Sequence, residues 1–472
     1  FGSPYAALSF TAVDPALAVF DPRATPLEQF AELVDGVHGR GALLFIDIAI
    51  NHTGWAAGLH ESHPRWLARG ADGEIERPGA WGITWADLTR LDYAHSDLWQ
   101  YMAEVFLTWC RRGVDGFRCD AGYMIPAEAW RYIIARVKDQ YPDTVFFLEG
   151  LGGKVSVTRD LLNRANFNWA YSELFQNYDR GQIDHYLPEA LAISSSDGVT
   201  LHYAETHDNN RLADRSSAWA RMRTALCALL SHQGAFGFAN GVEWLATEKI
   251  DVHKASALNW GAAENQVAAI RRLTSLLKTH PAFGHGTRLE NVAAAQGHFA
   301  AFARRTGGPA EALVILANLD DGAPIEAAWR GAQEGPFFDL LDGSPLAPVF
   351  RDGSWHHPLD PGEVRCLSSD PQAAARLAAA ESAAQRIPAP GIARQEARAT
   401  LLRIHARLTG SPICSRELLE EGVRELLAGP EALCARLNPK ADHPCCVAWR
   451  WPQDAAREVM VPPDFCPVSY TH

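Results

Sequence analysis

The stretch VDGFRCDAGY, Val114–Tyr123, places a cation and a carboxylate at the end of a short apolar strand. It follows the amphipathic run HSDLWQYMAEVFLTWCRRG, which predicts a helix over about 96–111. In a strand, residues i and i+2 point to the same face, so Arg118 and Asp120 share one face, with Phe117 and Cys119 on the other. An Arg beside an Asp lowers the pKa of the carboxylate and keeps it ionised. This pattern alone fits either a structural ion pair or a functional site.

Composition bounds the class of protein. The chain has 472 residues, which suggests about two to four domains. Its formal net charge of −13 argues against nucleic acid or an anionic membrane surface as the main partner. The nine Cys are scattered without a C-x-x-C pair, which indicates reduced thiols and predicts a cytoplasmic protein. The sequence contains no run of about 18 apolar residues, so it predicts no membrane span.

Residues 1–285 alternate short apolar strands with amphipathic helices, which is typical of parallel βα units. The run GALLFIDIAINH (41–52) is nearly continuous in apolar residues, as in a strand buried on both faces. Polar residues follow several of the strands, namely Asp47, Asn51 and His52, then Arg118 and Asp120, Glu149, His207 and Asp208, and Glu243. Functional groups at the ends of many strands are typical of a (β/α)8 TIM barrel, so this α/β fold is predicted.

Four further segments are predicted from changes of pattern. An irregular Trp- and Gly-rich insert covers about 53–94, and short alternating strands over 286–369 predict an antiparallel β-sandwich. Residues 370–435 are rich in Ala, Leu and Arg and predict a helical segment. Residues 436–472 return to β-like character and are interpreted as the start of a further module or a linker.

Three acids at successive strand ends are expected to converge on one cleft. Two carboxyl groups in different environments are the apparatus of glycoside cleavage, one ionised and one protonated. Asp120 has Arg118 on its own face and is the better ionised nucleophile. Glu149 follows the apolar run VFFL, which would raise its pKa and suit an acid that later acts as a base. Asp208, beside His207, can hold sugar hydroxyls and stabilise the transition state.

Several motifs in this order resemble those of one family, the α-amylase superfamily of retaining glycoside hydrolases and transglycosylases (glycoside hydrolase family 13). The resemblance rests on DIAINH (47–52) for the third barrel strand, GFRCD (116–120) for the fourth, FLEG (147–150) for the fifth, ETHDNN (205–210) for the seventh, and GAFGFANGVE (234–243) for the eighth, with Phe236 where Pro is usual. FGSPYAALSFTAVDP (1–15) resembles the stretch after the second strand. The resemblance covers roughly residues 1–285, and the family's sandwich domain would cover 286–369.

The resemblance implies Asp120 as nucleophile, Glu149 as general acid/base and Asp208 as transition-state stabiliser. Arg118 would orient Asp120, His207 and His52 would contact the −1 sugar, and Asp47 would support that subsite. Asn51 is a calcium ligand in many relatives, but no further calcium ligand is identified here. Structural calcium therefore has no support, and neither a metal site nor a required cofactor is predicted.

Two departures bear on substrate and chain organisation. Amylases often carry Lys and His three and four residues after the nucleophile, on the leaving-group side, where this chain has Tyr123 and Met124. Tyr123 could therefore stack on a sugar face or simply pack. The first two barrel strands should lie upstream of Phe1, so we expect further domains of the same polypeptide.

The expected substrate is an α-1,4-glucan or maltooligosaccharide. The first choice is a 4-α-glucanotransferase like the transferase part of bacterial glycogen-debranching proteins, and the alternatives are an α-amylase-like hydrolase or a maltosyltransferase. Transfer and hydrolysis share the covalent step and differ in what attacks second. A non-catalytic glycan-binding homologue is a further alternative, although such proteins typically lose one of the acids. A metal-dependent barrel would need a ligand cluster that the sequence does not show.

Overall fold

The computed structural model describes most of the chain. The described residues are 3–18, 24–80, 82–253, 256–306, 312–331 and 335–384, with the short segments 394, 397–398, 400–402, 416–429, 445–449 and 457–461. Much of the predicted helical segment 370–435 and most of the predicted module 436–472 lie outside the described residues.

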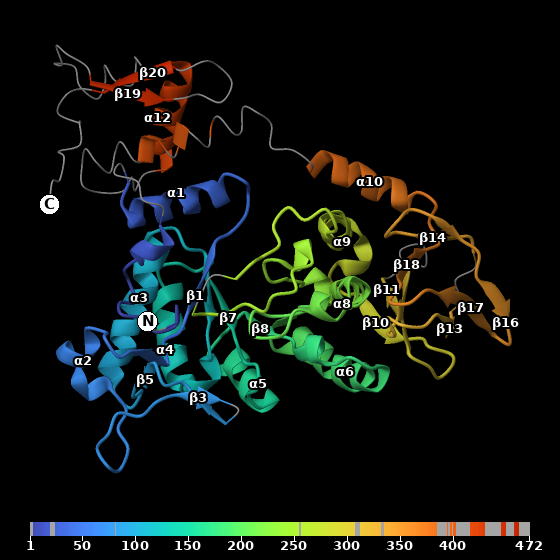
Figure 1. Ribbon diagram of the computed structural model, residues 1–472, viewed down its shortest axis with the longest axis horizontal. Coiled ribbons are helices and arrows are strands. Elements are labelled where there is room, and N and C mark those ends of the chain that lie inside the picture. The colour runs from blue at the N-terminus through green and yellow to red at the C-terminus, as the bar shows by residue number, and fades with distance from the viewer. Residues whose placement is uncertain are drawn as a thin grey trace.

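A parallel sheet forms the centre of the first part of the chain (Figure 1). Its strands, in spatial order, are β1 (Phe45–Ile48), β6 (Gly116–Cys119), β7 (Val145–Leu148), β8 (Trp169–Tyr171) and β9 (Val199–Leu201). An isolated parallel bridge between His202 and Phe236 extends the sheet by one position. The predicted parallel βα organisation is confirmed, while closure into a barrel stays a prediction.

Two predicted strands are shorter than expected. The apolar run 41–52 forms a strand only over Phe45–Ile48, and the eighth-strand segment contributes only the bridge at Phe236. Backbone pairing ends early in the first case because His52 turns into β2 (His52–Gly54), which pairs antiparallel with β5 (Leu88–Arg90) instead. The expected burial on both faces also holds only in part, because β1 stands at the end of the strand order, only Ile48 of its four residues is buried, and Leu43 is 63% exposed.

Helices alternate with the strands, and α3, α4 and α5 share one apolar cluster with β6 and β7. The helices are α1 (Pro26–His38), α3 (Ser96–Arg111), α4 (Ala127–Lys138), α5 (Val155–Arg164), α6 (Arg180–Ser196), α8 (Ser217–Leu229) and α9 (Val267–Thr279). Phe117 and Cys119 of β6 point into the core with Phe106 of α3 and Trp130 of α4. This leaves the opposite face of β6, which carries Arg118, free to build a site.

The insert over about 53–94 contains short elements that hold the N-terminal segment in place. They are β2, α2 (Leu59–Ser62), β3 (Gly79–Ala80), β4 (Ile83–Thr84) and β5. The Thr53 hydroxyl donates to the Ala7 carbonyl at 2.6 Å, and the Ser3 amide donates to Asp87 at 3.0 Å. Gly54 allows this approach, since a Cβ there would lie 2.6 Å from the carbonyl oxygen of Ala6. Residues 3–10 are thereby fixed beside the sheet.

Antiparallel strands follow in the region predicted as a sandwich. One sheet has the order β10 (Arg288–Asn291), β11 (Phe299–Arg305), β12 (Leu313–Asn318), β18 (Val364–Ser368), β14 (Phe337–Asp339) and β15 (Pro345–Leu346), and the other has β13 (Ile325–Trp329), β17 (Ser354–Leu359) and β16 (Val349–Arg351). Phe299, Leu316 and Trp329 belong to an apolar cluster shared by the two sheets. The antiparallel sheets are therefore confirmed, and the domain boundaries stay predictions.

The described part of the C-terminal third contains α10 (Ala373–Ala384), α12 (Arg416–Ala428) and a pair of strands, β19 (Cys445–Trp449) and β20 (Arg457–Val461). Arg272 of α9 binds Glu381 of α10 at 2.8 Å, which ties α10 to the preceding part of the molecule. Arg398 donates to Asp35 of α1 at 2.7 Å. Among the described helices, none combines the length and apolar character needed to cross a bilayer.

Phe117 lies at the centre of the core under the site, which gives a stability test. Its ring centroid is 4.6 Å from that of Phe106 and 5.7 Å from that of Phe146. We expect Phe117→Ala to lower the free energy of unfolding by about 3–5 kcal/mol, because it leaves a cavity in a closed core. Chemical denaturation followed by circular dichroism measures it. The exposed Phe350→Ala is the control, with an expected change of about 0.5 kcal/mol, and equal effects of the two would contradict the assigned core.

Candidate active site

Arg118 joins two carboxylates at the end of the parallel sheet. The register pairs Asp47 of β1 with Arg118 of β6 directly across the strands. Arg118 Nη1 donates to Asp47 Oδ1 at 2.9 Å and to Oδ2 at 3.0 Å, and it also donates to Asp120 Oδ1. The side chain of Arg118 is only 10% exposed, so solvent screens these pairs weakly. One buried guanidinium therefore orients both acids.

The predicted effect of Arg118 on the pKa of Asp120 is only partly right. Arg118 does lower that pKa, but burial is the larger influence and raises it, and the neighbouring charge of Asp47 adds to the rise. The net result is a pKa of Asp120 above its usual value rather than below it. The i, i+2 pattern showed the cation but not the depth of burial, and burial disfavours the charged form of a carboxyl group.

Two backbone amides hold the carboxylate of Glu149, and one of them belongs to Ala121, the residue after Asp120. Glu149 Oε2 accepts a hydrogen bond from the Ala121 amide at 2.8 Å, and its Oε1 accepts one from the Leu151 amide at 2.9 Å. Ala121 has a φ of 43°, a left-handed conformation that costs an L-residue about 1–2 kcal/mol. Burial raises the pKa of Glu149 to about 7, despite the opposing effect of Arg118. The apolar strand before Glu149 predicted this rise correctly.

Tyr5 connects three of the predicted residues and was not itself predicted. Its hydroxyl donates to Asp47 Oδ2 at 2.7 Å and lies 3.0 Å from His207 Nε2, while its carbonyl lies 3.1 Å from His52 Nε2. The Tyr5 and His207 rings stack at 6.0 Å with an interplanar angle of 14°. Tyr5 lies in a polar, Ser- and Pro-flanked stretch, and only the fixed N-terminal segment brings it into the site.

Asp208 and His207 lie beside the Tyr5–Asp47 pair. His207 Nε2 lies 3.5 Å from Asp208 Oδ2, and the charge of Asp208 also acts on Asp120. The side chain of Asp208 is 55% exposed, so it is the most open of the three acids. Nearby, Glu205 accepts from Arg211 Nη1 at 2.7 Å and from the Leu212 amide at 2.6 Å, which fixes both ends of this loop.

Asn51 and His52 are buried beneath the surface of the site. His52 is 1% exposed, and burial lowers its pKa to about 4, so its imidazole is neutral at pH 7. Asn51 is 4% exposed and its Nδ2 lies 3.0 Å from the Met124 sulfur. Both residues are therefore near the acids in the fold, but neither is open to a ligand in this structure.

Aromatic side chains surround Arg118 on its open face. The guanidinium carbon of Arg118 lies 5.6 Å from the Tyr171 ring centroid, and Tyr171 lies 4.7 Å from Tyr203. Burial raises the pKa of Tyr171 above its usual value, which keeps its hydroxyl protonated. Tyr171 and Tyr203 were not predicted from the sequence. In β8, Trp169 and Tyr171 are two positions apart, so the alternation of a strand places both aromatic side chains on one face.

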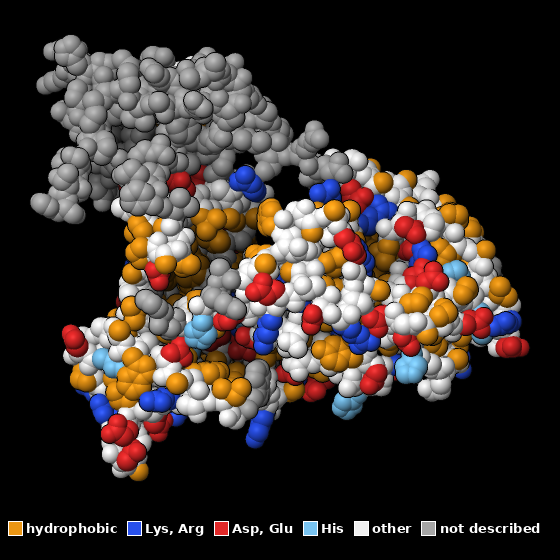
Figure 2. All heavy atoms as spheres, viewed as in Figure 1, with side chains coloured by type: hydrophobic (Ala, Val, Ile, Leu, Met, Phe, Trp, Pro, Cys, Tyr) orange, Lys and Arg blue, Asp and Glu red, His pale blue; other side chains and the backbone are white. Residues whose placement is uncertain are grey.

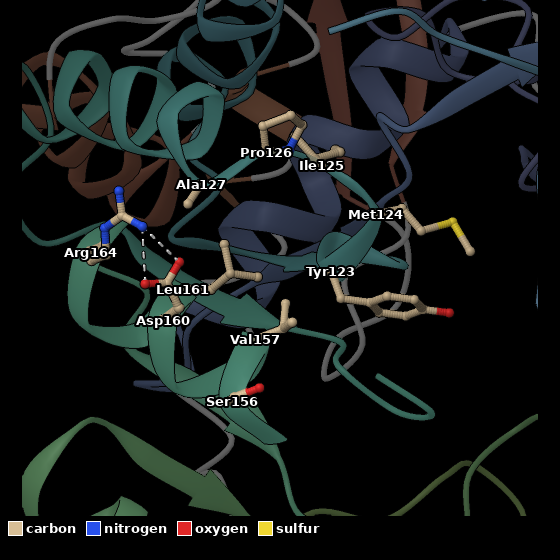
Figure 3. A pocket seen from close by; sticks show the side chains of 10 residues that line it. All are labelled: Tyr123, Met124, Ile125, Pro126, Ala127, Ser156, Val157, Asp160, Leu161 and Arg164. Atoms are coloured by element: carbon tan, nitrogen blue, oxygen red, sulfur yellow. Dashed lines mark hydrogen bonds and ion pairs between the residues drawn. The ribbon is translucent and has the colours of Figure 1, made fainter. Parts of the chain in front are cut away.

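A groove of about 660 Å³ lies between the connection from β6 to α4 and helix α5. It is lined by Tyr123, Met124, Ile125, Pro126, Ala127, Ser156, Val157, Asp160, Leu161 and Arg164. Figure 3 shows Tyr123 and Met124 at one end and the Asp160–Arg164 ion pair at the other. Burial raises the pKa of Tyr123 to about 12, and the charges of Glu149 and Asp120 contribute. Tyr123 therefore stands between the acids and the groove.

The three acids differ in exposure, because the Asp208 side chain is 55% exposed, that of Asp120 is 16% exposed, and Glu149 is buried. Figure 2 shows acidic side chains gathered in a hollow near the middle of the visible face. Within the described residues, no group of three His, Cys, Asp or Glu side chains is placed to hold a metal ion. The buried side-chain oxygen of Asn51 has no hydrogen-bond partner in the described part of the chain.

This arrangement suits proton transfer beside a second carboxyl group. Glu149 can hold or release a proton near neutral pH, whereas Asp120 lies against a permanent cation. Two carboxyl groups whose environments differ in this way can divide the roles of acid and nucleophile. The geometry therefore supports a cleavage reaction that needs both.

Solved structures with similar folds include α-amylases. A crystal structure of an alpha-amylase from Lactobacillus plantarum matches with a TM-score of 0.62 and 22% identity, covering 77% of this chain and 85% of that one. A maltogenic alpha-amylase from Thermotoga neapolitana matches with a TM-score of 0.63 and 17% identity, over 78% of this chain and 85% of that one. The chain therefore has the fold of these enzymes.

Curated proteins with similar sequences carry one name. The alpha-1,4-glucan:maltose-1-phosphate maltosyltransferase of Cereibacter sphaeroides is 26% identical over 392 residues, which cover 79% of this chain and 56% of that protein. That of Rhodospirillum rubrum is 26% identical over 383 residues, covering 75% and 54%. The chain thus spans about half the length of the curated relatives it matches. No family model matches the chain. The predicted resemblance to the α-amylase superfamily is confirmed, and the curated relatives that it rests on are named as enzymes.

The raised pKa of Glu149 predicts a pH-dependent stability. Between its ordinary pKa of 4.5 and about 7, the folded state binds more protons than the unfolded state, so stability falls as pH rises. This fall amounts to about 3 kcal/mol in the free energy of unfolding. Glu149→Gln removes the titration, so the stability difference should move in favour of the variant between about pH 5 and pH 8. Denaturant titrations over this range measure it, and parallel curves for the two proteins would contradict the raised pKa.

Proposed function

We propose that this chain, which resembles the α-amylase superfamily and shares its fold, is an α-1,4-glucan-active transferase that retains the anomeric configuration. The observation that carries the proposal is the joined set of acids, in which Arg118 binds Asp47 and Asp120 while Glu149 is held by the amide next to Asp120. Retaining glycoside cleavage needs one carboxyl group to attack and a second to give and take a proton.

In the first step, Asp120 attacks C1 of the donor sugar while the bond from C1 to the leaving oxygen breaks. Arg118 sets the orientation of the attacking carboxylate and favours its ionised form. Glu149, protonated below about pH 7, gives its proton to the leaving oxygen. The product is a glycosyl ester on Asp120.

In the second step, a hydroxyl of an acceptor glucan attacks C1 and the ester bond to Asp120 breaks. Glu149, now ionised, takes the proton from that hydroxyl, so both acids return to their first states. Asp208 and His207 face the same sugar and hold its hydroxyls. Tyr5 and Asp47 fix His207 and Arg118 and so act as positioning residues.

The transferred group is proposed to be a maltosyl unit. The relatives reported above are maltosyltransferases, which favours this alternative over the debranching-type 4-α-glucanotransferase that was the first choice from the sequence. Maltose 1-phosphate is then the donor, and phosphate is the leaving group of the first step. The acceptor is the non-reducing end of an α-1,4-glucan, which grows by two glucose units in each cycle.

The choice of donor gives a direct test. With maltose 1-phosphate and maltoheptaose, we expect chains longer by steps of two, one phosphate released per step and a constant number of reducing ends. With maltoheptaose alone, chains both shorter and longer would indicate a glucanotransferase, and shorter chains with rising reducing ends would indicate a hydrolase. No reaction with either substrate would favour a non-catalytic glycan-binding protein and overturn the proposal.

The nucleophile assignment is checked in the same assay. Asp120→Asn removes the attacking carboxylate and should lower the rate at least about 10³-fold, as loss of a nucleophile does elsewhere. The exposed Asp139 at the end of α4 gives the matched control, and Asp139→Asn should retain the parental rate. A variant Asp120→Asn that keeps more than a tenth of the activity would rule out the assignment.

Tyr123 is proposed to hold the acceptor, because it lies beside Glu149 at the mouth of the groove. We expect Tyr123→Ala to raise the KM for maltoheptaose about tenfold and to increase the share of hydrolysis, since water then competes better for the ester. Tyr123→Phe keeps the ring and should stay close to the parent. A rise in KM for the donor alone would place Tyr123 on the other side of the cleaved bond.

A further inference from the structure

Trp260 is a large aromatic side chain with 80% of its surface exposed. It lies in the long segment between the eighth-strand bridge at Phe236 and α9, outside the acids already described. Exposure of so much indole costs hydrophobic stabilisation, and the described part of this segment offers it no cover. A single exposed Trp is common on protein surfaces, but the fixed backbone turn around Trp260 and its contact with a second Trp are not explained by exposure alone.

The backbone presents Trp260 at the tip of a tight turn. Asn259 has a φ of 55° and Gly261 a φ of 79°, so both neighbours of Trp260 are in the left-handed region. The Ala262 amide donates to the Asn259 carbonyl at 3.1 Å and closes the turn. The Asn259 side chain donates to the Trp244 carbonyl at 2.8 Å, which anchors the turn to the preceding segment.

Trp260 is paired with a second indole. Its ring centroid lies 5.4 Å from that of Trp244, with an interplanar angle of 42°. Trp244 belongs to the short helix η6 (Val242–Trp244), which is fixed by the buried Gln266. Gln266 donates from its side chain to the Val242 carbonyl at 2.7 Å and from its amide to the Glu243 carbonyl at 2.9 Å. The pair is therefore a preorganised aromatic surface.

The same segment is tied to the loop that carries His207 and Asp208. Arg211, which binds Glu205 in that loop, also donates to the Asn240 carbonyl at 2.6 Å and to the Glu248 carbonyl at 3.3 Å. The Trp pair thus stands on a segment whose both sides are fixed to the wall of the candidate active site. The two indoles therefore keep a fixed position relative to the loop that carries His207 and Asp208, and a ligand that extends from this loop can reach them without a rearrangement of the backbone.

We infer that the Trp244–Trp260 pair is a second binding site for the glucan, where glucose rings of a long chain stack while its end is at the acids. Pyranose rings have apolar faces that pack on aromatic rings, and an edge of hydroxyls that stays in water. A rigid indole loses little conformational entropy on binding, so it contributes affinity without ordering a loop. The inference rests on the proposed function for the identity of the ligand as an α-1,4-glucan.

Binding of glucans of two lengths tests this inference. Isothermal titration calorimetry in an Asp120→Asn background, where turnover is suppressed, gives dissociation constants for maltoheptaose and for maltose. Trp260→Ala should raise the constant for maltoheptaose about tenfold and that for maltose less than about twofold. Trp260→Phe should recover most of the loss, which separates stacking from misfolding.

Phe350 provides the matched control, because it is also an exposed aromatic residue paired with a Trp, at 5.1 Å from Trp355. Phe350→Ala should leave both dissociation constants within twofold. Equal loss for maltose and maltoheptaose, or no loss at all, would overturn the inference while the transfer assay with maltose 1-phosphate still stands. A parent that neither binds maltoheptaose nor reacts would overturn both proposals. Dissociation of a dimer by Trp260→Ala in sedimentation would instead assign the pair to self-association.

Discussion

The site depends on one buried guanidinium shared by two carboxylates. Strand pairing places Asp47 opposite Arg118, and the chain turns after Cys119 so that Asp120 reaches the same cation. Loss of one member of a buried ion pair typically costs about 3–5 kcal/mol, because the remaining charge is left without compensation. The register of β1 and β6 is therefore fixed by charge on one face and by the aromatic core on the other.

The sequence predicted a side chain's role or pKa correctly where the residues that determine it are close neighbours along the chain. Asp120 and Glu149 could be predicted because each directly follows an apolar strand, and the raised pKa of Glu149 followed from the same window. The pKa of Asp120 was misjudged because its largest influence is burial by segments distant in the sequence. The parallel order of the strands was also predictable, whereas the length of each strand depended on later pairings such as that of β2 with β5.

Long-range contacts explain what the sequence did not reveal. Tyr5 is 42 positions from Asp47 and 202 from His207, and nothing in its own surroundings marks it as part of a site. Its place depends on the insert, whose Thr53 and Asp87 hold the N-terminal segment. Similarly, Trp260 reads as an ordinary loop residue until the turn that presents it and its contact with Trp244 are seen together.

The surplus of carboxyl groups around Arg118 has a consequence for how a donor arrives. Asp47, Asp120, Asp208 and Glu149 surround a single guanidinium, so the field in the described part of the cleft is negative once Glu149 ionises. A phosphorylated donor therefore approaches more easily while Glu149 keeps its proton and when mobile ions screen the acids, whereas the approach of a neutral oligosaccharide depends on neither. The dependence of the association rate on ionic strength therefore carries information about which class of donor the cleft is built to receive.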